Sequence, residues 1–308
     1  MNQADPLVLP TAARAAEPLH VARGTRRPTA EPAPVRWLLI AAATLYLGLF
    51  LVLPLAAVFT QALQHGVAGY LAAVTEPAAR DAIRLTLLTA AIVVPLNTLF
   101  GLAAAWAIAR FRFAGRGLLR AAIPLPLAVS PVIAGLIFVL LLGARGPLGP
   151  WLADRGWPVI FAPPGVVIAT LFVTLPLVAG ELLPLLEALG AEEEEEAAVL
   201  LGAGGWAVFW RVTLPNIKWG LLNGLILCNA RAMGEFGAVS VVSGHVRGLT
   251  NTIPLHVEVL YNEYRFTDAF AVASLLTLLA LVTLLVKHLA GEHTVAEPGA
   301  PRAGREAP

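Results

Sequence analysis

The sequence predicts an all-α integral membrane protein with six transmembrane helices, and three observations support this fold class. The 308 residues are 58% hydrophobic and only 13% charged, whereas soluble domains average about 45–50% apolar and about 25% charged residues. Six apolar runs reach the roughly 20 residues that a helix needs to cross a bilayer. None of these runs alternates apolar and polar residues, as the strands of a membrane β-barrel do.

The composition also excludes several functional classes. The 21 lysines and arginines nearly balance the 20 acidic residues, so there is no excess of positive charge to bind nucleic acid. A single cysteine, Cys228, excludes an internal disulfide and a cysteine-based metal site. The six histidines show no metal-ligand spacing such as H-E-x-x-H. We therefore expect no metal site and no catalytic residues.

The six predicted spans share their length and their apolar composition. They comprise residues 37–59, 82–109, 121–142, 165–186, 219–242 and 269–289. We expect residues 36–290 to form the membrane domain. Residues 1–35, which are rich in Ala, Pro and Arg, and residues 291–308 are predicted to be disordered tails.

The positive charges predict the orientation of the chain. Of the 21 lysines and arginines, fourteen lie on the side that both termini share, six lie on the opposite side, and Arg231 lies inside a span. Cytoplasmic loops carry the excess of Lys and Arg in membrane proteins. Both termini are therefore predicted to be cytoplasmic, which agrees with an even number of spans.

The segment between the fourth and fifth predicted spans differs from a simple connection. It reads EEEEEAAVLLGAGGWAVFWRVTLPNIKWG over residues 192–220. Acidic residues favour a helix start, and Gly202, Gly204 and Gly205 permit a sharp turn after that helix. Pro215 is expected to end a second short helix. Apolar residues on such a loop indicate either a docking surface for another protein or a helix that lies on lipid.

The same segment resembles the EAA loop of binding-protein-dependent ABC importer permeases. That motif is Glu-Ala-Ala, three residues, Gly, nine residues, a branched aliphatic residue, one residue and Leu-Pro. The residues that match it, all at the motif's spacing, are Glu196, Ala197, Ala198, Gly202, Val212, Leu214 and Pro215. Val212 stands where Ile is commoner. The resemblance implies the type I importer permease fold, with its core at residues 82–289 and its coupling loop at residues 192–216.

The resemblance also implies the partners of the chain. In this family a separate ABC ATPase hydrolyses ATP, and the loop sits in a cleft of that ATPase and transmits its closure to the helices. This chain has only two lysines, Lys218 and Lys287, and neither follows the glycine that a Walker A loop requires. We therefore expect no cofactor on this chain, with ATP and Mg on an ATPase dimer. A second homologous permease in the same inner (plasma) membrane and a periplasmic binding protein complete the expected complex.

Four further segments resemble the W-type permease subunit of sulfate/thiosulfate importers. They are VSPVIAG at 129–135, GPLGPWL at 146–152, NARAMGEFGAVSVVSGHVRG at 229–248 and IPLHVE at 253–258. This resemblance implies sulfate or thiosulfate as the substrate and a sulfate-binding protein as the periplasmic partner. Permeases for molybdate or tungstate share the shorter GEFGA core and are the alternative.

Charged residues inside the predicted spans form a second candidate site. An isolated charge at the centre of a membrane helix costs about 2.5–3.5 kcal/mol on insertion scales. Arg231 and Glu235 are four residues apart, so we expect them to share a helix face and to be paired. They would act either as a gate or anion-path element or as a packing ion pair at the subunit interface. Glu181 in the fourth span allows the same two interpretations.

Two other functional classes receive less support. An ion-coupled secondary transporter would need intramembrane acids and an inverted repeat, but only Glu181 and Glu235 are available and no repeat is visible. A membrane enzyme or scaffold would leave the spacing of the EAA motif as a coincidence.

Overall fold

The computed structural model describes residues 33–189 and 194–291, and these residues contain helices and no strand. The all-α fold class is therefore confirmed. The predicted tails lie almost entirely outside the described residues. Only their inner ends are described, and these ends are helical, because α1 (Ala33–Leu47) begins at Ala33 and α15 (Phe266–Gly291) ends at Gly291.

Four helical stretches are long and apolar enough to cross a membrane. They are Pro34–Ala62, Pro77–Arg110, Pro163–Leu189 and Phe266–Leu285. Two bent pairs of helices bring the number to six: Arg116–Ala128 with Pro131–Leu142, bent by 106°, and Gly205–Met233 with Gly237–Ser243, bent by 48°. The third and fifth predicted spans are therefore broken rather than continuous.

Prolines account for the break in the third predicted span. This stretch consists of α5 (Arg116–Ala122), α6 (Leu125–Ala128) and α7 (Pro131–Leu142). Between α6 and α7, Val129 and Ser130 are extended, with ψ of 135° and 132°. A residue before proline is driven out of the helical region by the proline ring. Pro131 therefore breaks the helix at Ser130 and begins α7, a position that proline favours.

The chain divides into two compact units, residues 1–54 and residues 55–308. In the described part of the first unit, α1 continues into the π-helical turn η1 (Gly48–Val52), and α2 (Leu53–Ala62) begins at the unit's end. The second unit holds the remaining helices. Its short elements outside the spans are α3 (Gly66–Thr75), α8 (Gly149–Ala153), α10 (Glu194–Leu200) and α14 (Ile253–Asn262).

The core of the second unit is built from α4 (Pro77–Arg110), α9 (Pro163–Leu189) and α12 (Leu214–Met233), which pack against one another. Glycines allow the close approach. A Cβ at Gly101 of α4 would lie 2.9 Å from Val178 Cβ, and a Cβ at Gly224 of α12 would lie 3.2 Å from Val178 Cα. Small residues let membrane helices approach closely, so Val178 of α9 is enclosed by two glycines.

A buried polar side chain ties the same three helices together. The Asn97 amide of α4 donates to the Leu171 carbonyl at 3.2 Å and to Thr174 Oγ1 at 2.7 Å, both on α9. It also contacts Cys228 Sγ of α12 at 3.7 Å. Hydrogen bonds between membrane helices hold them in register. Cys228 is thus a buried core residue.

The predicted helix end at Pro215 is wrong. From Gly205 to Met233 the chain is one continuous helix, made of α11 (Gly205–Val208), the π-helical turn η2 (Phe209–Thr213) and α12. Proline lacks an N–H and clashes with the carbonyl four residues earlier. The π turn absorbs this, since Leu214 N–H pairs five residues back with Phe209 O. The turn η1 precedes Pro54 in the same way.

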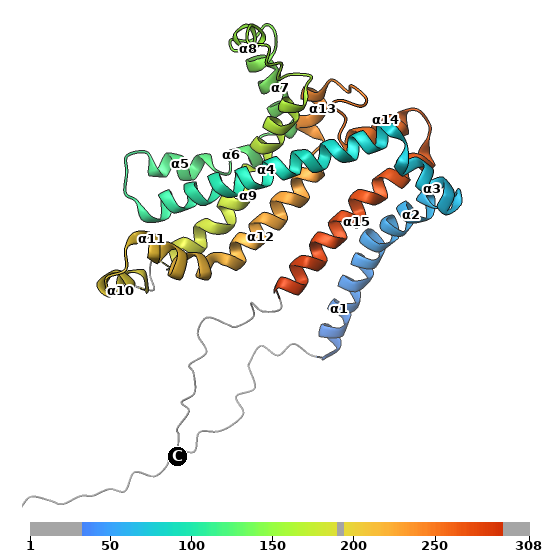
Figure 1. The fold of residues 1–308 in the computed structure, drawn as a ribbon. Helices are drawn as coiled ribbons and strands as arrows, with labels where there is room; N and C mark the ends of the chain where they lie inside the picture. Colours follow the sequence, from blue (N-terminus) through green and yellow to red (C-terminus); the bar gives the residue numbers. More distant parts are fainter. Residues whose placement is uncertain (1–32, 190–193, 292–308) are drawn as a thin grey trace, which may run out of the picture. The chain divides into compact units, whose positions relative to one another are not determined.

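Figure 1 shows that α10 and α11 lie at one end of the second unit, while α8, α13 (Gly237–Ser243) and α14 lie at the opposite end. Near the latter end, an ion-pair network fixes the corner between α3 and α4. The Arg265 guanidinium donates to both oxygens of Glu76, at 3.2 and 2.8 Å, and through Nε to Asp268 at 2.8 Å. This network joins the start of α4 to the start of α15.

Candidate functional site

The predicted coupling loop folds as a helix, a sharp turn and a second helix. α10 ends at Leu200, and Gly202 follows with a left-handed φ of +91°. Gly202 N–H donates to Val199 O at 2.9 Å, and Ala203 N–H donates to Ala198 O at 3.0 Å. This pair of bonds is the Schellman motif, in which glycine takes the left-handed position without a steric penalty. Gly202 therefore sets the direction in which the chain leaves α10.

The seven motif residues lie on both sides of this turn. Glu196 and Ala197 are exposed on α10, and Ala198 is half-buried there. Gly202 forms the turn itself. The remaining three occupy the second helix, where Val212 and Leu214 are half-buried and Pro215 is exposed. Residues 190–193, which include the first two glutamates of the acidic run, lie outside the described residues.

The sequence analysis missed the residue that anchors this loop to the core, Glu195. Its carboxylate accepts a hydrogen bond from Thr213 Oγ1 of η2 at 2.6 Å and forms an ion pair with Arg110, the last residue of α4. The neighbouring Glu194 accepts a hydrogen bond from Asn216 at 2.8 Å. The acidic run did signal this role, but only the tertiary structure shows which carboxylate faces inward.

The outer surface of the loop is strongly apolar. Leu200, Leu201 and Trp206 are 87%, 90% and 74% exposed. Trp206 also packs against Phe209 and Trp210, with ring centroids 5.9 and 5.6 Å apart. Exposed apolar groups of this size, placed next to charged residues, mark a contact surface for another protein or for lipid. Both interpretations offered by the sequence therefore fit this surface.

The charged residues Arg231 and Glu235 lie on either side of the end of α12. Arg231 is on α12, while Glu235 lies in the non-helical link to α13. Arg231 Nη2 is 3.0 Å from Glu235 Oε2, and Glu235 Oε1 accepts a hydrogen bond from Ala238 N–H at 2.9 Å. The Glu235 side chain is fully buried, whereas 39% of the Arg231 side chain is exposed. The carboxylate therefore holds the start of α13 as well as the guanidinium.

Glu181 belongs to a different place. It lies on α9 and accepts a hydrogen bond from Asn223 of α12 at 2.7 Å. Asn223 precedes Arg231 by eight residues, or about 12 Å along the helix axis. The structure therefore does not bring Glu181 together with Arg231 and Glu235, although the sequence analysis grouped the three.

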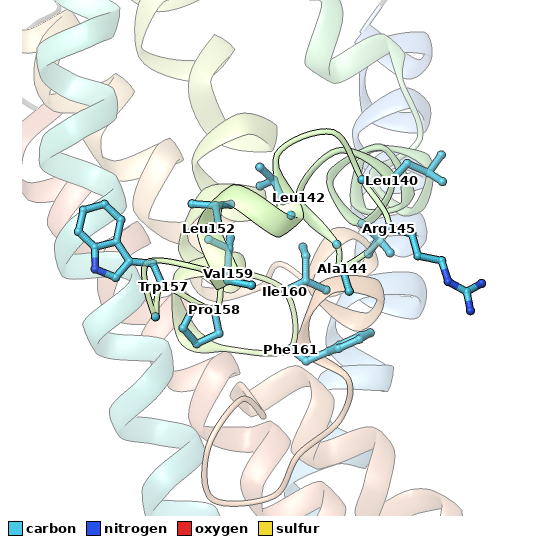
Figure 2. A pocket seen from close by; sticks show the side chains of 16 residues that line it. Leu140, Leu142, Ala144, Arg145, Leu152, Trp157, Pro158, Val159, Ile160 and Phe161 are labelled. Atoms are coloured by element: carbon cyan, nitrogen blue, oxygen red, sulfur yellow. The ribbon is translucent and has the colours of Figure 1, made fainter.

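A pocket of about 660 Å³ lies beyond α7, in the connection through α8 to α9. Figure 2 shows that apolar side chains such as Leu152 and Ile160 surround it and that the Arg145 guanidinium extends away from them. A bound oxyanion needs hydrogen-bond donors and positive charge around it. This apolar pocket does not supply them. In the described part of the chain, no three His, Cys, Asp or Glu residues are grouped so that they could hold a metal.

Comparisons with known proteins agree with this arrangement. Residues 97–291 match the family described as "Binding-protein-dependent transport system inner membrane component". The chain is 52% identical over 260 residues to the sulfate transport system permease protein CysW of Synechocystis sp., an alignment that covers 84% of this chain and 94% of that protein. It is 47% identical over 254 residues to CysW of Escherichia coli K12, covering 82% and 87% of the two chains. Identity to the CysT permease of the same bacterium is 37% over 240 residues, covering 78% and 86%.

Solved structures share the fold. A crystal structure of a bacterial ABC transporter involved in the import of the acidic polysaccharide alginate contains a chain that matches with a TM-score of 0.68 and 19% identity. The match covers 85% of this chain and 97% of that chain. At this identity the similarity concerns the fold alone. Together with the sequence match, it shows that the chain belongs to the family of inner membrane components of binding-protein-dependent transport systems.

Proposed function

We propose that this chain is a permease subunit of an ATP-driven sulfate importer. The observation that carries the proposal is the 52% and 47% identity to two CysW sulfate permeases, over more than four fifths of the chain. The lower identity to CysT, 37%, favours the CysW position in the complex and leaves the second permease position to a CysT-like protein. The permease itself performs no chemistry on the substrate.

The coupling loop is the proposed contact with a cytoplasmic ABC ATPase dimer, which holds ATP and Mg. Three features support this role. The loop carries the EAA spacing, it presents exposed Leu200, Leu201 and Trp206, and it continues without a break into α12. Movement of the ATPase against α10 would thus reach the membrane helices directly. We therefore assign this surface to the ATPase rather than to lipid.

We infer that both termini and the coupling loop lie in the cytoplasm. The excess of Lys and Arg on that side supports it. α8 and α14, at the other end of the second unit, then face the periplasm (Figure 1). A periplasmic sulfate-binding protein delivers the anion from that side. The two permease subunits enclose the translocation path at their interface.

The test is reconstitution of the complete importer. The chain is purified with its permease partner and ATPase, inserted into proteoliposomes, and supplied with the binding protein and radiolabelled sulfate. ATP-dependent uptake of sulfate is expected, with competition by unlabelled thiosulfate and weaker competition by molybdate or tungstate. Uptake of molybdate or tungstate without uptake of sulfate would overturn the sulfate assignment.

A Gly202 variant tests the coupling role separately. Gly202→Val forces a β-branched residue into a left-handed conformation, which costs about 1–2 kcal/mol. The turn should therefore open, and the orientation of α10 relative to the following helix should change. We expect weaker capture of the ATPase and lower sulfate uptake. Gly205→Ala is the matched control, because Gly205 has no positive φ and no atom near a built Cβ. Normal ATPase capture together with normal sulfate uptake in Gly202→Val would contradict the proposed coupling role of this loop.

A further inference from the structure

Two broken helices meet at their breaks. α7 begins at Pro131 after the 106° bend, and α13 begins at Gly237 after the 48° bend. A Cβ at Gly237 would lie 2.9 Å from Pro131 Cβ, and a Cβ at Gly135 would lie 2.7 Å from Ala238 O. The first turns of the two helices are therefore in direct contact, and Figure 1 shows α7 and α13 side by side.

Non-helical backbone at membrane depth has a restricted set of locations. It is tolerated where it is buried in protein or where it lines a water-filled cavity, because its free N–H and C=O groups need partners. In secondary transporters, discontinuous helices are a common way of building a substrate site, and the same need for free backbone groups to find partners holds in this bundle. The paired breaks at Ser130 and at 234–236 are thus the place in this bundle where a polar substrate is most easily accommodated.

The ion pair at this place is asymmetric. Glu235 is fully buried and uses one oxygen for Ala238 N–H and the other for Arg231. Arg231 keeps 39% of its side chain exposed, and a guanidinium has five N–H donors. The exposed part of the pair is thus the guanidinium, which faces away from the core of this chain. Among the described residues, Glu235 Oε1 is satisfied by Ala238 N–H, whereas the buried Oε2 has the ion pair with Arg231 and no hydrogen bond. The Arg231 guanidinium therefore faces the carboxylate on one side and is exposed on the other.

The exposed part of Arg231 needs a polar environment. Arg231 lies seventeen positions after Leu214, or about 25 Å along the helix axis, so it is remote from the cytoplasmic loop. Exposure of a guanidinium to lipid at such a depth is costly, and charged residues in spans face a water-filled cavity or another protein. The exposed neighbours Ala230 and Gly234 are too small to cover it.

We propose that Arg231 contacts the transported oxyanion in the translocation path and that Glu235 positions the guanidinium for this contact. The proposal rests on the proposed function, since it requires a transported anion. Arginine is suited to it because its planar fork of donors matches tetrahedral oxyanions and carries a permanent charge. The carboxylate leaves the local charge near zero until the divalent anion arrives, so the anion passes without being trapped.

The first experiment compares sulfate uptake by the reconstituted complex carrying single and double variants. Arg231→Gln should reduce initial uptake about tenfold or more, as expected for loss of a charge-assisted contact, with complex assembly unchanged. Arg231→Lys should retain more uptake. Glu235→Gln keeps the acceptor for Ala238 N–H and the cation at 231, so it should transport better than Arg231→Gln. Arg84→Gln, at an exposed arginine of α4, is the control for loss of one positive charge.

The double variant separates a substrate contact from a packing pair. If Arg231 served only to neutralise Glu235, then Arg231→Gln combined with Glu235→Gln would regain wild-type uptake, and the proposal would be overturned. We expect the double variant to remain as slow as Arg231→Gln. Wild-type uptake in Arg231→Gln would overturn the proposal as well, while leaving the sulfate importer intact. Failure of the wild-type complex to take up sulfate would instead overturn the proposed function.

Chemical rescue compares two charges at position 231 within one and the same folded variant. In a Cys228→Ser background, Arg231→Cys is treated with a positively charged aminoethyl methanethiosulfonate or a negatively charged sulfonatoethyl methanethiosulfonate. The cationic adduct should regain uptake and the anionic adduct should not. Equal recovery with both reagents would show that only the volume at position 231 matters, and would overturn the proposal.

Discussion

The Arg110 guanidinium, at the end of α4, is bound to the Glu195 carboxylate of α10, 85 positions further along the chain. The same carboxylate accepts a hydrogen bond from the hydroxyl of Thr213, the last residue of η2 before α12. One acidic side chain therefore joins the coupling loop to two core helices. Through Glu195, the orientation of α10 depends on both α4 and α12.

Glu195→Ala should loosen this junction. Both side chains are about one-fifth exposed, so removal of the carboxylate leaves a largely buried guanidinium without its partner, at a cost of about 1–3 kcal/mol. We expect a lower midpoint of thermal unfolding in detergent and weaker capture of the ATPase. Glu195→Gln keeps an acceptor for Thr213, so its unfolding midpoint and its ATPase capture should lie between those of the wild type and Glu195→Ala. Asp154→Asn, at an exposed acid of the opposite end, serves as control, and equal behaviour of all variants would contradict the role of Glu195.

Gly224→Val should separate α12 from α9. The added side chain would meet the Val178 backbone, which cannot move aside, and overpacking of this kind costs about 1–3 kcal/mol. The midpoint of thermal unfolding should drop, and the yield of folded protein with it. Gly180→Ala on α9 is the control, because a Cβ there meets nothing within 4 Å. A drop of the same size for Gly180→Ala would show that loss of glycine itself, rather than the contact, is responsible.

Asn97→Ala should weaken the link among the three core helices. It removes the donor to Leu171 O and Thr174 Oγ1, and hydrogen bonds between membrane helices contribute about 0.6 kcal/mol on average and up to about 1.7. Unfolding by denaturing detergent measures the loss. Thr98→Ala is the matched control, because Thr98 bonds only to the Val94 carbonyl of its own helix. A larger effect at Thr98 than at Asn97 would argue against the link.

The stability of the chain should fall in acid through Glu76. The hydrogen bond from Arg265 holds the pKa of the Glu76 carboxyl below its ordinary value of 4.5, even though partial burial acts in the opposite direction. A carboxyl with a depressed pKa stabilises the fold above the unfolded-state pKa and loses this effect as the pH falls through the folded-state value. The midpoint temperature of unfolding should therefore decrease once the pH is lower than about 4.5.

A Glu76→Gln variant checks this assignment. It should start from a lower midpoint at neutral pH and show a shallower decline in acid, because the titrating group is gone. Asp154→Asn should keep the wild-type slope. Parallel curves for wild type and Glu76→Gln would mean that other carboxyl groups cause the acid sensitivity.

Sequence reasoning succeeded where a local property decides the structure. Apolar length located the candidate membrane segments, and the glycines of the acidic segment located the turn that the chain makes at Gly202. The 106° break was also within reach, because the effect of Pro131 on Ser130 is local. The sequence analysis nevertheless treated residues 121–142 as one continuous span.

Other features depend on contacts between distant residues. The break after α12 contains no proline, and Glu235 stabilises it by capping α13 and holding Arg231. Likewise, Pro215 does not end its helix, because η2 widens the preceding turn. The pairing of Glu195 with Arg110 spans two helices. Hydrophobic periodicity carries no information about any of these three.

The continuous helix from Gly205 to Met233 has a mechanical consequence. Trp206 is exposed near one end of this helix and Arg231 lies near the other end, so the two residues belong to one continuous helix. Gly224 packs against Val178 part of the way along this helix, so this close contact would act as the pivot if the helix tilts. A small tilt imposed at the loop would then displace Arg231 relative to the neighbouring helices. The π turn η2 is the point at which the helix would bend first.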